Sequence, residues 1–225
     1  MALAYRLPVD TWERHAVVAS LAGRPRTVLD VGGVPRVLAT FMADAAITTA
    51  NVDSRADVQI SGTELPFADA MFDVATSIDV LEHLDHHDRG VHLMELARVA
   101  QERVVFCCPL GTAAHAESER RLAEWYEHTT GRQHRFLKEH IACGLPDEVE
   151  LRTLTSVLPG SCTFGFHGDF RRAEEMFRLG VLTRVQPHRY GFHYVRQRLF
   201  ARPDRALDLS AHEFTNRAFV VVNLR

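Results

Sequence analysis

Acidic and glycine residues follow two apolar stretches of the sequence at spacings suited to a nucleotide-like ligand. Asp30, Gly32 and Gly33 close the apolar run that begins at Thr27, and a glycine pair lets a ligand approach the backbone closely. Asp53 closes the next apolar run, about 20 residues after Gly33. A carboxylate there can accept hydrogen bonds from ribose hydroxyls, so the pattern indicates a cofactor that carries a nucleoside.

A second group of residues, Asp79, Glu82 and His83, has side chains that could do chemistry. On a helix their spacing places two acids and an imidazole on one face. An imidazole can take a proton near neutral pH, which makes His83 the candidate general base. The alternative is structural, because Asp79 and Glu82 also have the spacing of a helix capping box.

The elements that must position these groups alternate between β-branched runs and helical patterns, as in a parallel sheet covered on both faces. The expected strands are Thr27–Val31, Ile47–Val52, Phe72–Ile78 and Arg103–Cys108. Helices are expected near Val34–Ala43 and His87–Ala100, whereas too few residues follow Asp53 for another crossover helix. The first half is therefore predicted to be a doubly wound α/β core.

Beyond Pro109 the pattern becomes largely helical. Helices are expected at Ala114–His128, Gln133–Cys143, Asp169–Leu182 and Tyr190–Ala201, and strands at Ser161–Phe166 and Arg217–Leu224. The segment from Gly144 to Asp147 should end one helix and begin another. His134, Arg135 and His140 fall in this half and are candidates to bind a substrate.

Composition suits one globular domain and excludes several partners. The chain has 225 residues, 46% of them apolar, and a formal net charge of −3, which argues against a nucleic-acid surface. No apolar run reaches the roughly 20 residues of a membrane helix, and Met1–Asp10 lacks the pattern of a secretion signal. Four cysteines without a CxxC pairing favour reduced thiols in a cytoplasmic protein.

Two neighbouring motifs carry a resemblance to a known superfamily. LPFADAMFDV at residues 65–74 and SIDVLEHL at residues 77–84 resemble motifs of the bacterial class I S-adenosylmethionine-dependent methyltransferases. With VLDVGG at residues 28–33 and Asp53, the resemblance covers about residues 27–110. It implies an α/β, Rossmann-like doubly wound sheet of about seven strands, mostly parallel with an antiparallel C-terminal strand. Residues 1–225 would form one domain, with a cofactor half to about 110 and inserted lid helices in an acceptor half.

The resemblance implies S-adenosylmethionine as the cofactor and assigns residues to it. Asp30, Gly32 and Gly33 would lie along its methionine and ribose part, and Asp53 would hold the ribose hydroxyls. The other implied cofactor residues are Ser61, Gly62 and Thr63 at the adenine, and Ile78 and Asp79 beside the methionine portion.

Two features depart from the superfamily pattern, and both bear on cofactor affinity. The usual G-x-G-x-G run continues here with Val34 and Arg36 instead of glycines. Ser61 stands where an aspartate commonly recognises the adenine amine.

The implied reaction is methyl transfer to a small-molecule acceptor, with oxygen favoured over nitrogen and His83 as the base. His134, Arg135 and His140 would bind the acceptor, and the arginine excess over residues 169–205 hints at an anionic one. We expect no metal ion. The alternative is a divalent cation on Asp79, Glu82 and His83, as the corresponding side chains can hold in ubiquinone-biosynthesis O-methyltransferases. A monomer or homodimer is expected, without nucleic-acid or membrane partners.

Two other function classes remain open. An NAD-type Rossmann oxidoreductase is disfavoured because Val34 interrupts G-x-G-x-x-G. A degenerate cofactor-fold protein that serves as a scaffold without catalysis is motivated by Val34 and Arg36. Titration with S-adenosylmethionine, S-adenosylhomocysteine and NAD would distinguish these classes.

Overall fold

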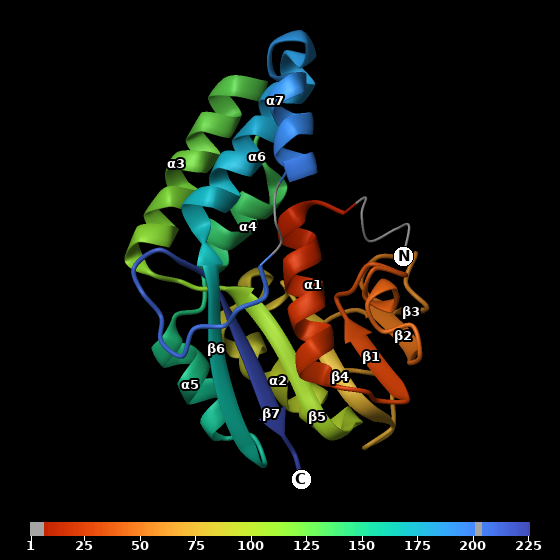
Figure 1. The fold of residues 1–225 in the computed structure, drawn as a ribbon. Coiled ribbons are helices and arrows are strands. Elements are labelled where there is room, and N and C mark those ends of the chain that lie inside the picture. Colours follow the sequence, from red (N-terminus) through yellow and green to blue (C-terminus); the bar gives the residue numbers. More distant parts are fainter. Residues whose placement is uncertain (1–6, 201–203) are drawn as a thin grey trace.

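Seven strands form one mixed sheet with helices on both faces (Figure 1). The computed structural model describes residues 7–200 and 204–225. The strands are β1 (Thr27–Val31), β2 (Ala46–Asn51), β3 (Val58–Gln59), β4 (Phe72–Ile78), β5 (Ala100–Pro109), β6 (Ser161–Asp169) and β7 (Thr215–Asn223), in the order β3-β2-β1-β4-β5-β7-β6. Strand β7 lies antiparallel between β5 and β6, and the other neighbours pair in parallel. The predicted Rossmann-like sheet with an antiparallel C-terminal strand is confirmed.

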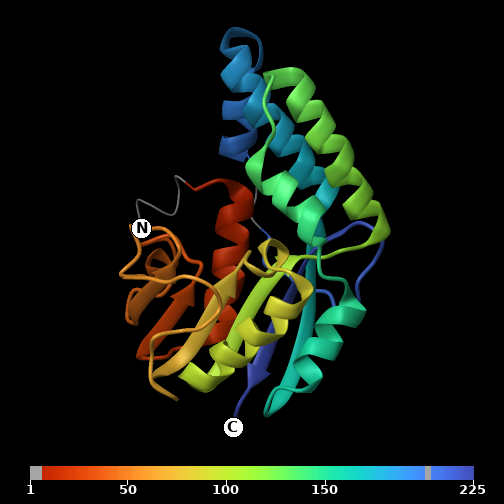
Figure 2. The ribbon, with the colours of Figure 1, turned by 180° about the vertical axis from the view of Figure 1, so that it is seen from behind.

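The helices form two covering layers and a third group beyond the sheet. Helix α1 (Val9–Ala22) packs on β4 and β5 on one face, and α2 (His86–Val99) and α5 (Glu148–Ser156) cover the other (Figure 2). The remaining helices are α3 (Ala113–Thr130), α4 (Arg135–Cys143), α6 (Phe170–Val185) and α7 (Pro187–Phe200). Because α3 follows the end of β5 and α6 follows the end of β6, this group lies over the carboxyl edge of the sheet.

Alternation along the central strands gives the protein two apolar cores. Val28, Val74 and Val105 face α1 and pack with Val18. Their neighbours in sequence point to the opposite face, where Leu29, Ala75 and Val104 pack with Leu93 and Leu96 of α2. Burying such side chains contributes roughly 1.5–3 kcal/mol each, so the central strands form a rigid base for the loops at their carboxyl ends.

The prediction of a helix near Val34–Ala43 is wrong. The segment forms turns and one short 3-10 helix, η2 (Leu38–Thr40). Arg36 has a φ of 72°, in the left-handed region, so an α-helix does not run through this segment. The crossover from β1 to β2 is therefore a compact loop.

The other elements match their expected positions closely, apart from one helix that was missed. Strands β1 and β4 have the predicted bounds, and the absent crossover helix after Asp53 is confirmed. Helix α7 begins before the expected Tyr190, and the expected end at Ala201 lies outside the described residues. Helix α1 was not predicted, although Val9, Trp12 and Ala16 have helical spacing.

None of the described helices is both long enough and apolar enough to cross a membrane.

Candidate functional site

A cleft of about 1840 Å³ opens at the carboxyl edge of the sheet. Its walls come from the ends of β1, β2 and β4, from α1, and from the helical layer formed by α3, α4, α6 and α7. Drug-sized ligand pockets occupy roughly 300–1,000 Å³, so this cleft has room for a cofactor and a second molecule. Carboxyl strand ends are also the edge where open α/β sheets bind ligands.

The glycine turn after β1 brings bare backbone to the cleft. Gly32 has a φ of 78°, and a Cβ at this position would lie 2.3 Å from Cγ2 of Val80. A Cβ on Gly33 would lie 1.9 Å from Oδ2 of Asp30. Neither position tolerates a side chain without movement of its neighbours, so both glycines are explained by close packing. Gly32 and Val34 line the cleft directly.

Asp30 supports the turn from below instead of lining the cleft. Its side chain is completely buried, and Oδ1 accepts a hydrogen bond of 2.9 Å from the Thr76 hydroxyl. Oδ2 has no hydrogen-bond partner among the described residues. Burial raises the pKa of the Asp30 carboxyl to about 7, although the Thr76 hydrogen bond lowers it. The structure thus keeps a free acceptor beneath the glycine turn.

Asn51 and Asp53 build the next part of the edge, at the end of β2. The Asn51 amide donates to the carbonyl oxygens of Gly32, at 2.8 Å, and Gly33, at 3.1 Å, which ties the two strand ends together. Asp53 lines the cleft and pairs with Arg55 at 2.6 Å. Hydrogen bonds from Arg55 lower the pKa of Asp53 to about 2. Asp53 is therefore ionised at neutral pH and can accept hydrogen bonds from hydroxyls.

The segment after β3 contributes two of its three predicted residues. Gly62 and Thr63 line the cleft, together with Ile60. Ser61 is exposed and does not line it. Gly62 has a φ of 76°, a conformation that favours glycine, with open space where a Cβ would be.

Asp79, at the end of β4, is engaged by arginines. Both Ile78 and Asp79 line the cleft. Asp79 pairs with Arg217 of β7, and its Oδ2 lies 3.2 Å from Nε of Arg14 of α1. Arg14 and Arg217 also pair with Asp10. These four charges form a network that joins α1, β4 and β7, and the Asp79 carboxylate already has two cationic partners.

The prediction that Asp79, Glu82 and His83 share one face of a helix is wrong. Leu81–His83 form one 3-10 turn, η3, and α2 begins only at His86. Asp79 has a φ of 55° and caps no helix. The Asp79 backbone is left-handed, and its carboxylate pairs with Arg14 and Arg217.

Glu82 and His83 instead meet His140 of α4. Glu82 is 1% exposed, and its Oε2 has no hydrogen-bond partner in the part of the chain described. The His83 and His140 ring centroids are 4.8 Å apart. Burial, and then the charge of His140, lowers the pKa of His83, so its imidazole is neutral at neutral pH and can accept a proton.

Carboxylates flank both imidazoles. Nδ1 of His83 lies 2.9 Å from Oε2 of Glu139, although the contact lacks the alignment of a hydrogen bond. Nδ1 of His140 forms a contact of 2.9 Å with Oε1 of Glu119, which lies on α3. A carboxylate oxygen therefore lies next to Nδ1 of each imidazole ring.

The other two predicted acceptor residues, His134 and Arg135, also line the cleft. His134 precedes α4 and packs edge-on against Tyr126 and Phe177. The Arg135 side chain is 79% exposed and pairs with Glu139 at 2.7 Å. Of the predicted acceptor residues, only His140 is thus brought against His83.

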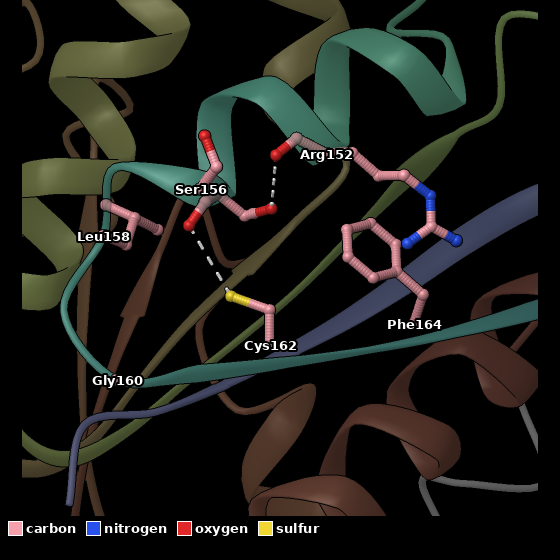
Figure 3. Close-up of a pocket in the computed structure, with 7 residues that line it drawn as sticks. Arg152, Ser156, Leu158, Gly160, Cys162 and Phe164 are labelled. Carbon is pink, nitrogen blue, oxygen red and sulfur yellow. Dashed lines mark hydrogen bonds between the residues drawn. The ribbon is translucent and has the colours of Figure 1, made fainter.

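A second, small pocket of about 290 Å³ lies beside α5 and the start of β6 (Figure 3). Arg152 covers the Phe164 ring, with 4.4 Å from the guanidinium carbon to the ring centroid. Because β6 runs parallel to β5, its first residues lie at the amino edge of the sheet. The pocket is therefore remote from the cleft, and it contains none of the predicted site residues.

Several residues of the cleft were not found by sequence reasoning. Asn51 has a weak signal, as a polar residue inside an apolar run, and Arg217 opens the apolar run of β7. No signal in the sequence pointed to Asp10 and Arg14, because helix α1 was not predicted. Glu139 was a sequence candidate for the acceptor pocket, and its contact with His83 arises because the fold brings α4 over η3.

Comparisons with known proteins agree with this architecture. Residues 18–108 match a family model described as a methyltransferase domain. No curated protein sequence is significantly similar to this chain.

Many solved structures share the fold. One is an S-adenosylmethionine-dependent methyltransferase from Thermotoga maritima, described as a possible histamine N-methyltransferase, with 12% identity, a TM-score of 0.58 and coverage of 99% of this chain and 92% of that one. Another is magnesium protoporphyrin IX methyltransferase from Synechocystis with bound S-adenosylhomocysteine, with 13% identity, a TM-score of 0.51 and coverage of 95% and 81%. At these identities the likeness shows the fold alone.

The family match covers the segment that carries the glycine turn, Asp53 and the two motifs, and the fold agrees over nearly the whole chain. Residues 18–108 therefore resemble a methyltransferase domain, and the chain as a whole has the fold of the solved S-adenosylmethionine-dependent methyltransferases.

Proposed function

We propose that this protein transfers a methyl group from S-adenosylmethionine to a hydroxyl of a small-molecule acceptor. The observation that carries the proposal is one cleft that joins the glycine turn and Asp53 to the imidazoles of His83 and His140. Cofactor-binding groups and proton-accepting groups thus line the same space.

The sheet edge fits the cofactor. The bare backbone at Gly32 allows close approach, and the ionised Asp53 can accept hydrogen bonds from both ribose hydroxyls. Gly62 and Thr63 would lie at the adenine, and Ile78 beside the methionine portion. Asp79 would act there together with Arg14, since a methionine tail carries both an ammonium and a carboxylate. Asp30 and Gly33 would shape the turn without direct contact.

The reaction needs an acceptor oxygen held in line with the sulfonium methyl. The bound cofactor supplies an electrophilic methyl group. Transfer to the acceptor oxygen would form a carbon–oxygen bond, break the carbon–sulfur bond and leave S-adenosylhomocysteine. Neutral His83 would take the hydroxyl proton, and Glu139 lies next to its Nδ1. Fixing the acceptor in this geometry supplies much of the acceleration.

The helical layer would select the acceptor. His134 and His140 face the cleft, and Arg172, Arg184 and Arg196 line it from α6 and α7. Glu174 and Glu175 line the same wall, so we propose a polar acceptor whose negative charge, where it has one, would meet these arginines. Residues 111–225 would thus act as the acceptor half of one domain, without a nucleic-acid or membrane partner.

Calorimetric titration tests the cofactor assignment directly. We expect S-adenosylmethionine and S-adenosylhomocysteine to bind and NAD not to bind. Preferential binding of NAD would favour the oxidoreductase alternative, and binding of none of the three would favour a scaffold. Release of S-adenosylhomocysteine with hydroxyl compounds and their matched amines then tests oxygen against nitrogen as the acceptor.

A further inference from the structure

Three side chains that can bind a metal ion converge at the inner wall of the cleft. Glu82, His83 and His140 each offer a ligand atom, and these atoms lie within 4.8 Å of one another. They come from two distant parts of the chain, the 3-10 turn after β4 and helix α4. All three residues line the cleft.

Glu82 has one unsatisfied carboxylate oxygen, and the methyl-transfer scheme gives this side chain no role. Its side chain is buried, and Oε2 has no hydrogen-bond partner among residues 7–200 and 204–225. A buried carboxyl without a partner is costly, and a bound cation would remove that cost.

The two histidines have the surroundings of metal ligands. Metal-binding imidazoles commonly present their other ring nitrogen to a carboxylate, which fixes the ring and its tautomer. Here Nδ1 of His140 forms a hydrogen-bond contact of 2.9 Å with Glu119, whereas Nδ1 of His83 lies 2.9 Å from Glu139 without the alignment of a hydrogen bond. This arrangement leaves Nε2 of each ring as the candidate ligand.

The donor set indicates the class of cation. Two imidazoles and one carboxylate suit zinc, cobalt or manganese better than magnesium, which prefers oxygen ligands. This set of ligands differs from the one suggested by the sequence, which was Asp79, Glu82 and His83. Asp79 pairs with Arg14 and Arg217, and His140 is the third ligand instead.

We propose that Glu82, His83 and His140 bind one divalent transition-metal cation, which presents an acceptor oxygen to the cofactor. Bonds of roughly 2.0–2.2 Å would require the three side chains to close by about 1 Å on binding. Three protein ligands leave positions open for oxygen atoms of the acceptor.

The role in the reaction rests on the proposed function, whereas cation binding itself does not. With the cation bound, His83 serves as a ligand. Coordination then lowers the pKa of the acceptor hydroxyl, so that its proton can leave to water without a general base. An acceptor with a second oxygen beside the hydroxyl would fill two open positions and be favoured.

The test is titration of the untagged, chelator-treated protein with Co²⁺, followed by visible absorption and calorimetry. We expect one Co²⁺ per chain. Glu82→Gln and His140→Asn should each weaken binding at least about tenfold. The matched control is His87→Asn, which changes an exposed histidine four residues from His83 and should bind Co²⁺ like the parent.

Titration of every variant with S-adenosylhomocysteine separates the two proposals and confirms folding. Retained S-adenosylhomocysteine binding with lost Co²⁺ binding would support the cation site. A parent protein that binds S-adenosylhomocysteine but no Co²⁺ would overturn the cation site and leave the methyl-transfer proposal standing. Equal Co²⁺ affinity in Glu82→Gln, His140→Asn and the parent would also overturn it.

Discussion

The sheet edge and the helical layer face each other across the cleft and present different kinds of atoms. The edge presents backbone at Gly32 and short side chains such as Asp53, held by strands that are buried on both faces. The layer presents long or aromatic side chains, among them His134, Arg135 and His140. The sheet edge is suited to binding the cofactor, and the helical layer is suited to selecting the acceptor. Substitutions at the sheet edge should therefore change cofactor affinity, and substitutions in the helical layer should change acceptor turnover.

The largest effect is expected at the glycine turn. Gly33→Ala would place a Cβ 1.9 Å from a buried oxygen of Asp30. Overpacking of this kind costs about 1–3 kcal/mol of stability, and relieving it must move the turn that lines the cleft, so S-adenosylhomocysteine binding should weaken as well. Gly90→Ala in α2 is the control, because its Cβ would meet only ordinary contact at 3.6 Å. Calorimetry and thermal melting measure both; equal binding by the two variants would remove the turn from the cofactor site.

Asp30 should make the sheet edge sensitive to pH. Its pKa of about 7 in the folded protein exceeds its ordinary value of 3.8, so the folded state holds the proton more tightly than the unfolded chain. Stability should therefore fall as pH rises from about 4 to about 7, by at most about 4 kcal/mol. Asp30→Asn should flatten this fall, and exposed Asp44→Asn should not. Identical urea-unfolding profiles for the parent and Asp30→Asn would contradict the raised pKa.

Asp53→Ala tests the ribose contact. Loss of hydrogen bonds to a charged group costs about 1.5–3 kcal/mol, so S-adenosylhomocysteine should bind roughly ten- to hundredfold more weakly. Arg55→Ala should have a much smaller effect, because Arg55 is exposed and only pairs with Asp53. Unchanged affinity in Asp53→Ala would refute the ribose assignment.

The helical layer should show the opposite behaviour. His134→Ala, Arg135→Ala and His140→Ala should leave S-adenosylhomocysteine affinity within about twofold of the parent and reduce acceptor turnover, most strongly for His140. Arg135 should matter least, since it is exposed and paired with Glu139. Steady-state kinetics with a methylated acceptor, beside calorimetry, measures the two effects. Loss of cofactor binding in all three variants would erase the distinction between the two regions.

The same distinction explains how far the sequence could predict the molecule. The sheet followed from periodicity, because buried strands must be apolar and their carboxyl ends must meet at one edge. Asp53, Gly62 and Ile78 were found because each stands at a strand end or in a motif of fixed spacing.

Contacts between distant elements could not be predicted in the same way. The pairing of Asp79 with Arg14 and Arg217 depends on a left-handed residue and on α1 and β7, which are far apart in sequence. The meeting of His83 with His140 depends on how α4 crosses η3. The helix expected at Val34–Ala43 failed because its local apolar pattern did not reveal the backbone of Arg36.

A crystal structure of the protein with S-adenosylhomocysteine tests the central claim most directly. We predict the ribose hydroxyls within hydrogen-bond distance of Asp53, the methionine portion beside Ile78 and Asp79, and the sulfur facing the pair formed by His83 and His140. A ligand bound elsewhere, or one whose sulfur faces away from these imidazoles, would contradict the account.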